Sequence, residues 1–361
     1  MQTIPIVQAR ELYTQELIDV YKSRPKPNGF LRSLGKEKES ASKYVSIEVS
    51  RIYEAIAVSV ERGTEGNRNK MPVSSNKTFE PPYFREFYDV TELSHYDYMF
   101  GANGSSISSG TYADFVDEAA DKMAMLQDKI DRAYEKQWAD VIQNGNIQLL
   151  GVEETVLIDF KRKSASMVTL TGSNTWDVAD PTISLLTGCE FLRTVGKAMG
   201  DTFMCVMDSL SLNALINNTA VQNRGKIYNY ALDLLSMPIR QSNGYALHGA
   251  ISVGSWRVIL MTYPQYYDAP VYGAGGTITG YTSTPYINPK TAILLPENPE
   301  FTMAFAAVPQ LIGPGMQPAK GKYLFGDYVD QRLGKHVFDI KSAGVAIPKA
   351  IDQIYTIKTL A

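Results

Sequence analysis

The chain contains very few residues of the kinds that build metal or redox sites. Its 361 residues include two cysteines, Cys189 and Cys205, and three histidines, His95, His248 and His336. Both cysteines stand in apolar surroundings typical of buried packing residues, and two cysteines form at most one disulfide, which excludes a disulfide scaffold and favours a reducing compartment. The histidines are far apart and share no ligand spacing with each other or with a cysteine. The sequence therefore predicts no metal site.

Long apolar runs and a strong excess of one charge are absent as well. No stretch of about 18 apolar residues occurs, and residues 1–10 lack the basic and apolar regions of a signal peptide. Thirty-five lysines and arginines against 38 aspartates and glutamates leave a net charge of −3, too near neutral for a protein whose main task is binding phosphates. We therefore expect no membrane partner, no export signal, and contact with nucleic acid only at local basic residues.

Motifs of catalysis and cofactor binding are also missing. The segment 273–276, Gly-Ala-Gly-Gly, has the composition of a phosphate loop but does not stand between a strand and a helix. The adjacent carboxylates of Glu153 and Glu154 precede a strand, where a solvated face explains them. We therefore predict that the chain is not an enzyme and has no catalytic or cofactor-binding residues. A cytosolic enzyme whose site these motifs do not reveal stays open as an alternative.

The chain does have the composition of a globular protein. Forty-four per cent of its residues are hydrophobic and 20% are charged, which excludes disordered and coiled-coil classes. Strand-like and helix-like segments follow one another without a regular βαβ order, so the predicted fold class is α+β. The strongest signal is a helix over 112–143, with apolar residues at three- and four-residue steps. It would be about 50 Å long, enough to cross a whole subunit.

Two segments near the start of the chain are expected to project. The pattern at 12–21 predicts a short helix within an N-terminal arm. From residue 43 to residue 60 the apolar residues follow a period of two, and a charged stretch with glycines follows at 62–70. The return strand at 77–83 contains Pro81 and Pro82, which suit a strand end. We predict a long projecting hairpin.

The later segments are expected to form a compact body. Strands are predicted at 155–160, 167–171, 202–207, 246–253, 256–262, 291–296, 337–347 and 354–360, and helices at 181–199 and 209–217. Asp180 as the cap and Pro181 at the first position open the first of these helices. The segment 264–289 is rich in Tyr, Gly and Thr and predicts a surface excursion. A contact with another subunit or with solvent is favoured there, and a carbohydrate-binding surface is the alternative.

Several short motifs occur in a fixed order along the chain. They are Phe30-Leu31-Arg32, Phe79-Glu-Pro-Pro-Tyr83, Trp176-Asp177 with Asp180-Pro181-Thr182, Gly244-Tyr-Ala-Leu-His-Gly249, Thr291-Ala-Ile-Leu-Leu295 and the C-terminal Ile354-Tyr-Thr-Ile-Lys-Thr-Leu-Ala361. This ordered set resembles the major capsid proteins of tailed bacteriophages over nearly the whole chain, most closely the lambda-type capsid protein E family. The resemblance implies the Hong Kong 97-type phage capsid fold.

The resemblance also implies that the chain is divided into five parts. These are an N-terminal arm (1–42), an extended loop hairpin (43–90), a peripheral domain with a long spine helix (91–180), an axial domain (181–325) and C-terminal strands that return to the peripheral domain (326–361). The tip of the extended loop is expected to contact an adjacent subunit through Arg62, Gly63, Glu65, Gly66, Arg68 and Lys70. A loop of the axial domain is expected near a capsomer surface or pore and contains Tyr272, Gly275, Gly276 and Tyr281.

By the same resemblance, the protein would be a major head protein that self-assembles into hexamers and pentamers of an icosahedral shell. The shell would enclose packaged double-stranded DNA and touch it only through non-specific contacts. It would be assembled in the bacterial host cytoplasm. Scaffold, portal and decoration proteins would be its partners. Some relatives join a loop lysine to an asparagine of a neighbour, for which Lys70 or Lys77 would be the candidates. The lambda-type branch uses decoration proteins instead, so we expect no cross-link. A phage tail-tube protein is a further alternative, but tube proteins are mainly β and a helix of about 50 Å would be unexpected in one.

Overall fold

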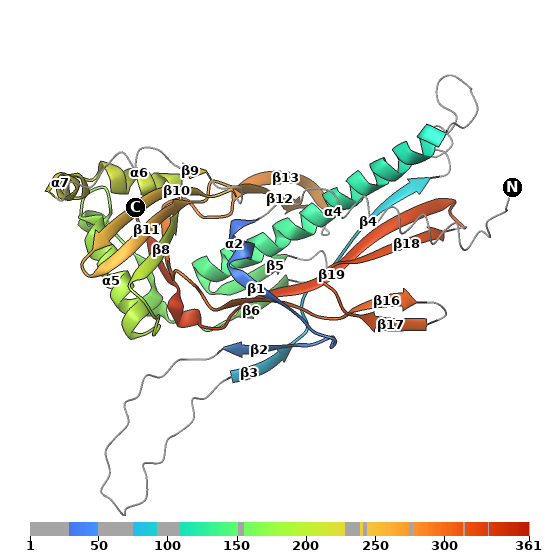
Figure 1. The fold of residues 1–361 in the computed structure, drawn as a ribbon, viewed down its shortest axis with the longest axis horizontal. Helices are drawn as coiled ribbons and strands as arrows, with labels where there is room; N and C mark the ends of the chain where they lie inside the picture. Colours follow the sequence, from blue (N-terminus) through green and yellow to red (C-terminus); the bar gives the residue numbers. More distant parts are fainter. Residues whose placement is uncertain are drawn as a thin grey trace, which may run out of the picture.

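The computed structural model combines a long helix with two large sheets and several two-stranded hairpins (Figure 1). It describes residues 29–49, 75–91, 109–150, 155–227, 239–240, 244–273, 277–312, 315–330 and 332–360. The predicted helix at 12–21 and the predicted strand residues 56–60 lie outside these ranges. Helices and strands are mixed without regular alternation, so the predicted α+β class is confirmed.

The long helix is α4 (Ser109–Asn144), which confirms the prediction for 112–143. Thirty-six residues at 1.5 Å per residue give a length of about 54 Å. Its side chains Ile130, Tyr134 and Trp138 recur on one face and are almost fully buried. Gly145 follows the last turn with a φ of 71°, the left-handed conformation that commonly ends a helix. The helix therefore begins and ends where its sequence pattern does, and buries one face against the body.

A five-stranded sheet lies against α4. It contains β1 (Gly35–Glu39), β15 (Phe301–Phe305), β19 (Lys335–Pro348) and β18 (Leu324–Asp330) in this order, and β4 (Tyr83–Thr91) also pairs with β19. β19 pairs with β15 along one half and with β4 and β18 along the other. The Trp138 ring stacks on Phe301 with centroids 4.9 Å apart. Burial of such rings supplies much of the hydrophobic stabilisation that holds the helix on the sheet.

A seven-stranded sheet forms the other half of the body. Its order is β7 (Met167–Thr169), β20 (Tyr355–Lys358), β14 (Thr291–Pro296), β8 (Thr202–Met207), β11 (Trp256–Thr262), β10 (Ala246–Val253) and β9 (Ile239–Arg240). β8 and β14 are buried along almost their whole length, as continuous apolar strands predict. The free thiols of Cys189 and Cys205 both lie in the core of this half, in agreement with a packing role.

Helices of the seven-stranded half are α5 (Pro181–Thr194), α6 (Ser209–Asn217) and α7 (Thr219–Ile227). The Asp180 carboxylate accepts the Thr182 N–H at 2.9 Å, so the predicted cap of α5 is confirmed. Asp208 caps α6 in the same way. Apolar residues of α5 and α6, including Leu185 and Leu215, pack into the core beside the sheet.

Several two-stranded hairpins belong to neither large sheet. They are β2 (Val45–Val49) with β3 (Ser75–Phe79), β5 (Asn146–Leu150) with β6 (Thr155–Asp159), β12 (Tyr266–Tyr272) with β13 (Ile278–Pro285), and β16 (Val308–Ile312) with β17 (Gly315–Ala319). The short elements are α2 (Phe30–Ser33), η1 (Ser164–Ser166), η2 (Gly172–Asn174) and η3 (Ile351–Gln353). Figure 1 shows β2–β3 and β16–β17 standing out from the body.

Three of the predicted divisions differ from the observed sheets. Residues 29–42 of the predicted arm are built into the body, because Phe30 and Leu31 are buried and β1 pairs with β15. The predicted axial range 181–325 contributes β15 to the five-stranded sheet. Within the range 326–361, β19 joins the five-stranded sheet and β20 pairs with β14 and β7, where its apolar side chains complete the core of the other sheet.

Two further properties concern the described ranges alone. None of their helices has the length and apolar character that crossing a bilayer requires. Nowhere in these ranges do three or more His, Cys, Asp or Glu side chains lie together so that they could hold a metal ion.

Candidate assembly site

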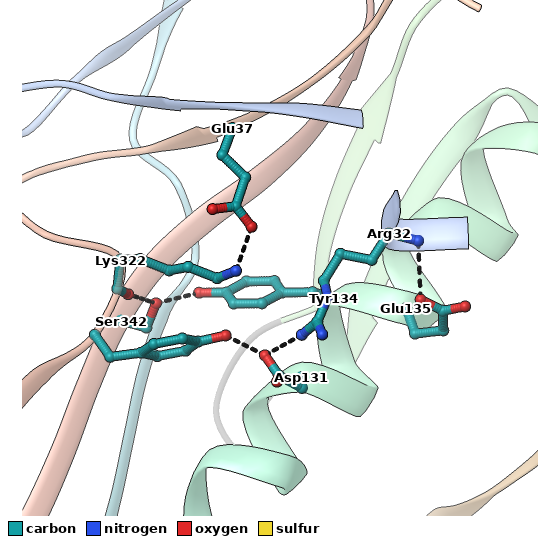
Figure 2. A network of polar contacts seen from close by, with 8 residues as sticks. Arg32, Glu37, Asp131, Tyr134, Glu135, Lys322 and Ser342 are labelled. Atoms are coloured by element: carbon teal, nitrogen blue, oxygen red, sulfur yellow. Dashed lines mark hydrogen bonds and ion pairs between the residues drawn. The ribbon is translucent and has the colours of Figure 1, made fainter. Parts of the chain in front are cut away.

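A buried carboxylate of α4 holds the segment that leads into β1 and β2 (Figure 2). The backbone N–H groups of Leu31 and Arg32 donate to the two carboxylate oxygens of Glu135 at 2.8 and 2.9 Å. They belong to the first turn of α2, where a helix leaves N–H groups unpaired. Gly29, at the N-cap, has no side chain to supply an acceptor. Glu135 therefore caps α2 from a position more than 100 residues further along the chain.

A third donor reaches the same carboxylate from the seven-stranded half. The Tyr263 hydroxyl, next to β11, donates to Glu135 Oε1 at 2.7 Å. Burial raises the pKa of the Glu135 carboxyl above its usual range, although the bonds from Tyr263 and from the α2 backbone act in the opposite direction. One carboxylate thus joins α4, α2 and the end of β11.

One helical turn earlier, Asp131 binds two further groups. Its carboxylate forms an ion pair with Arg32 and accepts the hydroxyl hydrogen of Tyr323, which precedes β18. Burial lowers the pKa of the Arg32 guanidinium, but the charge of Asp131 and its hydrogen bond outweigh this effect and the net shift is upward. Burial, together with the Asp131 charge, raises the pKa of Tyr323. Arg32 is thereby held as a cation between α2 and α4.

A chain of contacts continues to the edge strand β1. The Tyr134 hydroxyl lies 2.5 Å from Ser342 Oγ, and Ser342 donates to the backbone carbonyl of Lys322. Because a carbonyl oxygen only accepts, the serine hydrogen points to Lys322 and Tyr134 is the donor of the first bond. The Lys322 ammonium then pairs with Glu37 on β1. Figure 2 shows these contacts side by side with those of Asp131 and Glu135.

The C-terminal end of α4 is held by a guanidinium. Arg162 donates to the carbonyls of Ile142 and Gln143 at 3.0 and 3.2 Å, which are in the last turn of the helix. The same group donates to the Ile354 carbonyl at 3.0 Å and to Thr356 Oγ1 at 2.9 Å. Further bonds run to Ser166 Oγ and to its carbonyl, at 2.8 and 2.9 Å. Arg162 therefore ties α4 directly to β20 of the seven-stranded sheet.

The last turn of α4 also holds the base of the β12–β13 hairpin. The Gln143 amide donates to the Tyr286 carbonyl at 2.8 Å and accepts the Asn288 N–H at 2.7 Å. The base is closed by a backbone bond of 3.1 Å from the Tyr286 N–H to the Gln265 carbonyl. The helix thus fixes where two hairpins leave the body, β2–β3 through α2 and β12–β13 through Gln143.

The structure describes only the base of the predicted extended loop. β2 and β3 are antiparallel and belong to neither large sheet, and the exposed pair of Lys43 and Glu80 lies beside them at 2.9 Å. The predicted tip residues fall outside the described ranges: Arg62, Gly63, Glu65, Gly66, Arg68 and Lys70. Of the two lysines weighed as cross-link candidates, Lys77 lies on β3 and Lys70 belongs to the tip.

The predicted axial-domain loop is a β-hairpin. Tyr272 ends β12 and is half-buried, and Tyr281 on β13 is exposed, while Gly275 and Gly276 lie outside the described ranges. The Tyr, Gly and Thr content of 264–289 predicts a surface excursion, without assigning strands to it. Tyr, Val, Ile and Thr dominate the two arms, however, and they favour extended backbone. A register shift after Val271 marks a bulge near the tip.

The buried polar residues were not singled out from the sequence. Asp131 and Glu135 are four residues apart and stand on the same helix face as Tyr134 and Trp138. Two carboxylates inside an apolar stripe are the signal that could have revealed them, because charge on a buried face requires a partner. Arg162 has no comparable signal, since it follows a strand among other charged residues.

These contacts hold hairpins in place and contain no arrangement typical of catalysis. His248 binds Thr262 Oγ1 at 2.8 Å, and burial lowers its pKa. Burial also raises the pKa values of Cys189 and Cys205, which makes them poor nucleophiles. The contacts of these residues therefore hold hairpins in fixed positions on the body of the protein.

Comparison with solved structures identifies the fold. A prophage protein of Escherichia coli CFT073 that is described as a capsid protein is 12% identical, with a TM-score of 0.63, over 97% of this chain and 99% of that chain. A phage-related protein of Bordetella bronchiseptica RB50 is 13% identical, with a TM-score of 0.50, over 95% of this chain and 96% of that one. The shared architecture is the Hong Kong 97-type capsid fold.

The family follows from the sequence profile. The profile of the phage major capsid protein E family matches residues 13–320. No curated protein sequence matches the chain. The chain belongs to the phage major capsid protein E family, and it is a structural, capsid-forming protein of the virion and not an enzyme. The predicted fold and function are confirmed at this level.

Proposed function

We propose that the protein forms the hexamers and pentamers of a closed icosahedral shell around packaged double-stranded DNA, and that the shell assembles in the host cytoplasm. The observation that carries this proposal is the β2–β3 hairpin, which pairs with neither large sheet and stands away from the body (Figure 1). Projections that bury little surface on their own chain commonly bury it on a neighbour. Repeated over many identical copies, weak contacts of this kind stabilise a shell.

The two halves of the body correspond to the two domains of such a subunit. In this proposal, α4 and the five-stranded sheet are the peripheral domain, and the seven-stranded sheet with α5 and α6 is the axial domain. The extended loop leaves the peripheral domain through β2 and β3, and its tip at 62–70 contacts the adjacent subunit through mixed charges.

The β12–β13 hairpin is proposed to lie near a capsomer surface or pore. The segment 264–285 contains one charged residue, Asp268, and Tyr266 and Tyr281 are among its exposed side chains. Exposed aromatic residues without charge are typical of the central part of protein interfaces. This composition favours a contact with other copies around a symmetry axis.

The partners of the shell are proposed at the level of classes. Scaffold, portal and decoration proteins would bind to the assembled copies. DNA would be contacted non-specifically, since the net charge of −3 leaves only local basic residues for phosphates. We propose no covalent cross-link through Lys70 or Lys77.

Negative-stain electron microscopy tests the assembly. The protein is expressed with and without its neighbouring phage genes, and closed shells or flat hexameric sheets are expected. Small particles of uniform size under every condition, including coexpression with a scaffold, would contradict the proposal.

Deletion of residues 64–69 tests the role of the loop tip. The shortened subunit is expected to stay soluble and to form few shells or none. A matched variant that replaces the six residues with Gly and Ser separates the loss of charge from the loss of length. Normal assembly of both variants would show that the tip is not an intersubunit contact.

A further inference from the structure

Residues 29–42 run along one edge of the five-stranded sheet and are named here the strap. The strap contains α2 and β1, and β2 of the projecting hairpin begins three residues after it. β1 pairs with β15 over five residues. Two further backbone bonds extend this pairing, from the Ser40 N–H to the Phe305 carbonyl at 2.8 Å and from the Ala307 N–H to the Ser42 carbonyl at 3.0 Å. The strap therefore determines where the hairpin begins.

β1 is an edge strand that buries little surface. Within the described residues it pairs with β15 alone, in parallel, and its last four residues are exposed. Two ion pairs connect it to the segment before β18, Lys322 with Glu37 and Lys320 with Glu39. Ion pairs with partly exposed side chains contribute little to stability. β1 is therefore held mainly by its backbone bonds to one neighbour.

α2 cannot hold the strap on the body by its own stability. It has four residues, far fewer than the roughly 12 that an isolated helix needs, and the N–H groups of its first turn depend on Glu135. Docking of the strap also removes the charges of Arg32, Asp131 and Glu135 largely from water (Figure 2). The cost of this desolvation offsets much of their mutual attraction. The polar contacts therefore fix the position of α2 more than they stabilise it.

The apolar attachment of the strap is confined to its first residues. The Phe30 ring is buried, with its centroid 4.5 Å from that of Tyr245 and 5.7 Å from that of Tyr263. Leu31 is fully buried as well. None of the residues from 35 to 42 has a buried side chain. Two neighbouring side chains therefore supply most of the hydrophobic stabilisation of the docked strap.

The rest of the body is held together by contacts that do not involve the strap. β15 pairs with β19 over five residues on its other side. The Gln137 amide of α4 donates to the Gly344 carbonyl of β19 at 3.3 Å and accepts the Ala346 N–H at 3.1 Å. Arg162 joins α4 to β20. A segment with few buried contacts, beside a body with many, opens at a lower free energy than the whole chain unfolds.

We propose that the strap is a releasable element, which detaches from the body as one unit while α4 and both large sheets stay folded. Release frees the residues that lead directly into β2, so that the start of the extended loop can change its position without unfolding of the body. The release is a property of the free subunit, and its meaning for the extended loop rests on the proposed function.

Amide hydrogen exchange of the free subunit, measured by mass spectrometry of its peptides, tests the release. After correction for intrinsic rates, the protected amides of residues 31–39 are expected to exchange together, at least about 100-fold faster than those of β19. Phe30→Ala removes an apolar anchor and should speed exchange in the strap about tenfold or more, with less than about a twofold change in β19. Ile340→Val, at a buried position of β19, is the reciprocal control. It should speed exchange in β19 about threefold or more and change the strap less than about twofold.

Two patterns of exchange would overturn the inference. Equal protection of the strap and β19, with equal acceleration of both by each variant, would show that the strap opens only when the whole chain unfolds. Exchange of the wild-type strap at the rate of an unstructured peptide would show that there is no docked state to release.

The wild type in low concentrations of urea decides if a variant does not fold. Exchange in the strap should rise with urea less steeply than exchange in β19, because opening of the strap exposes less surface, and equal slopes would overturn the inference. These measurements need no assembled particles. Their failure is therefore distinguishable from a failure of the proposed function, which electron microscopy tests separately.

Discussion

Helix α4 is anchored at two places, and the two anchors are chemically opposite. In the middle of the helix, the carboxylates of Asp131 and Glu135 accept hydrogen bonds from α2 and from two tyrosines. At the end of the helix, the Arg162 guanidinium donates, mostly to backbone carbonyls. The first anchor holds a short segment that leads to a hairpin, and the second joins the helix to the other sheet.

The difference between the anchors has consequences for stability. Backbone carbonyls in the core have fixed positions, so removal of Arg162 leaves several buried acceptors without a donor. Burial lowers the pKa of Arg162, and Asp352 partly offsets this, but a guanidinium stays protonated at all ordinary pH values. The carboxylate anchor can change its protonation. We therefore expect the Arg162 anchor to be the stronger one and the carboxylate anchor to depend on pH.

The largest effect is expected for Arg162→Met. This change removes six hydrogen bonds of one side chain and should lower the free energy of unfolding of the free subunit by about 3–5 kcal/mol. Urea denaturation measures it. Arg257→Met, at an exposed position of β11, is the matched control and should change stability by less than about 0.5 kcal/mol. Equal effects of the two changes would show that Arg162 is not an anchor.

A smaller effect is expected for Gly145→Ala. A Cβ at Gly145 would lie 2.6 Å from Arg162 Cβ, and the residue has a φ of 71°, so the loss should be about 2–4 kcal/mol. Gly172 has the same kind of backbone conformation, with a φ of 59°, but a Cβ added there would meet no atom within 4 Å. Gly172→Ala should therefore lower the free energy of unfolding by only about 1–2 kcal/mol. The difference between the two variants measures crowding against Arg162, and it would vanish if the close packing at that end of α4 were wrong.

Much of this organisation can be read from the sequence. The apolar periodicity of 112–143 predicts α4 to within three residues at each end, and the strands at 202–207 and 291–296 have the same bounds in the structure. Asp180 and Pro181 predict the start of α5. These elements are predictable because their local patterns agree with their burial.

The anchors and the sheet assignment could not be predicted in the same way. Glu135 caps a helix 104 residues earlier in the chain, and no local pattern encodes such a contact. β20 and β19 are both apolar strands, and only the three-dimensional pairing assigns them to different sheets. The β12–β13 hairpin is a local pairing within 266–285, and the Tyr, Val, Ile and Thr residues of its two arms are the signal for it.

The ion pair between Asp131 and Arg32 should contribute less to the free energy of unfolding than the hydrogen bonds of Arg162 do. Asp131→Asn keeps the shape of the side chain but removes the charge opposite Arg32, and should lower the free energy of unfolding by about 1–3 kcal/mol. A double-mutant cycle with Arg32→Gln measures the coupling between the two side chains. Strictly additive effects would contradict a direct ion pair.

The smallest effect is a change in the pH dependence of stability. Burial raises the pKa of Glu135 above its ordinary value of 4.5, so the folded state holds a proton that the unfolded chain releases. The stability gained in this way is present below about pH 4.5 and is lost as the pH rises through the raised pKa, with a slope of at most about 1.4 kcal/mol per pH unit.

Glu135→Gln removes this titration. The stability of the wild type minus that of the variant should therefore fall as the pH rises from about 4.5 towards 7. Urea denaturation of the free subunit over a pH series measures this difference, with Glu190→Gln at an exposed position of α5 as the control. A difference that is independent of pH would contradict the assignment.

Electron cryomicroscopy of the assembled particles tests the central claim most directly. We predict a closed shell with fivefold and sixfold capsomers, in which each subunit keeps α4 joined to both sheets. A helical tube, or a shell whose subunits do not keep α4 joined to both sheets, would contradict this description.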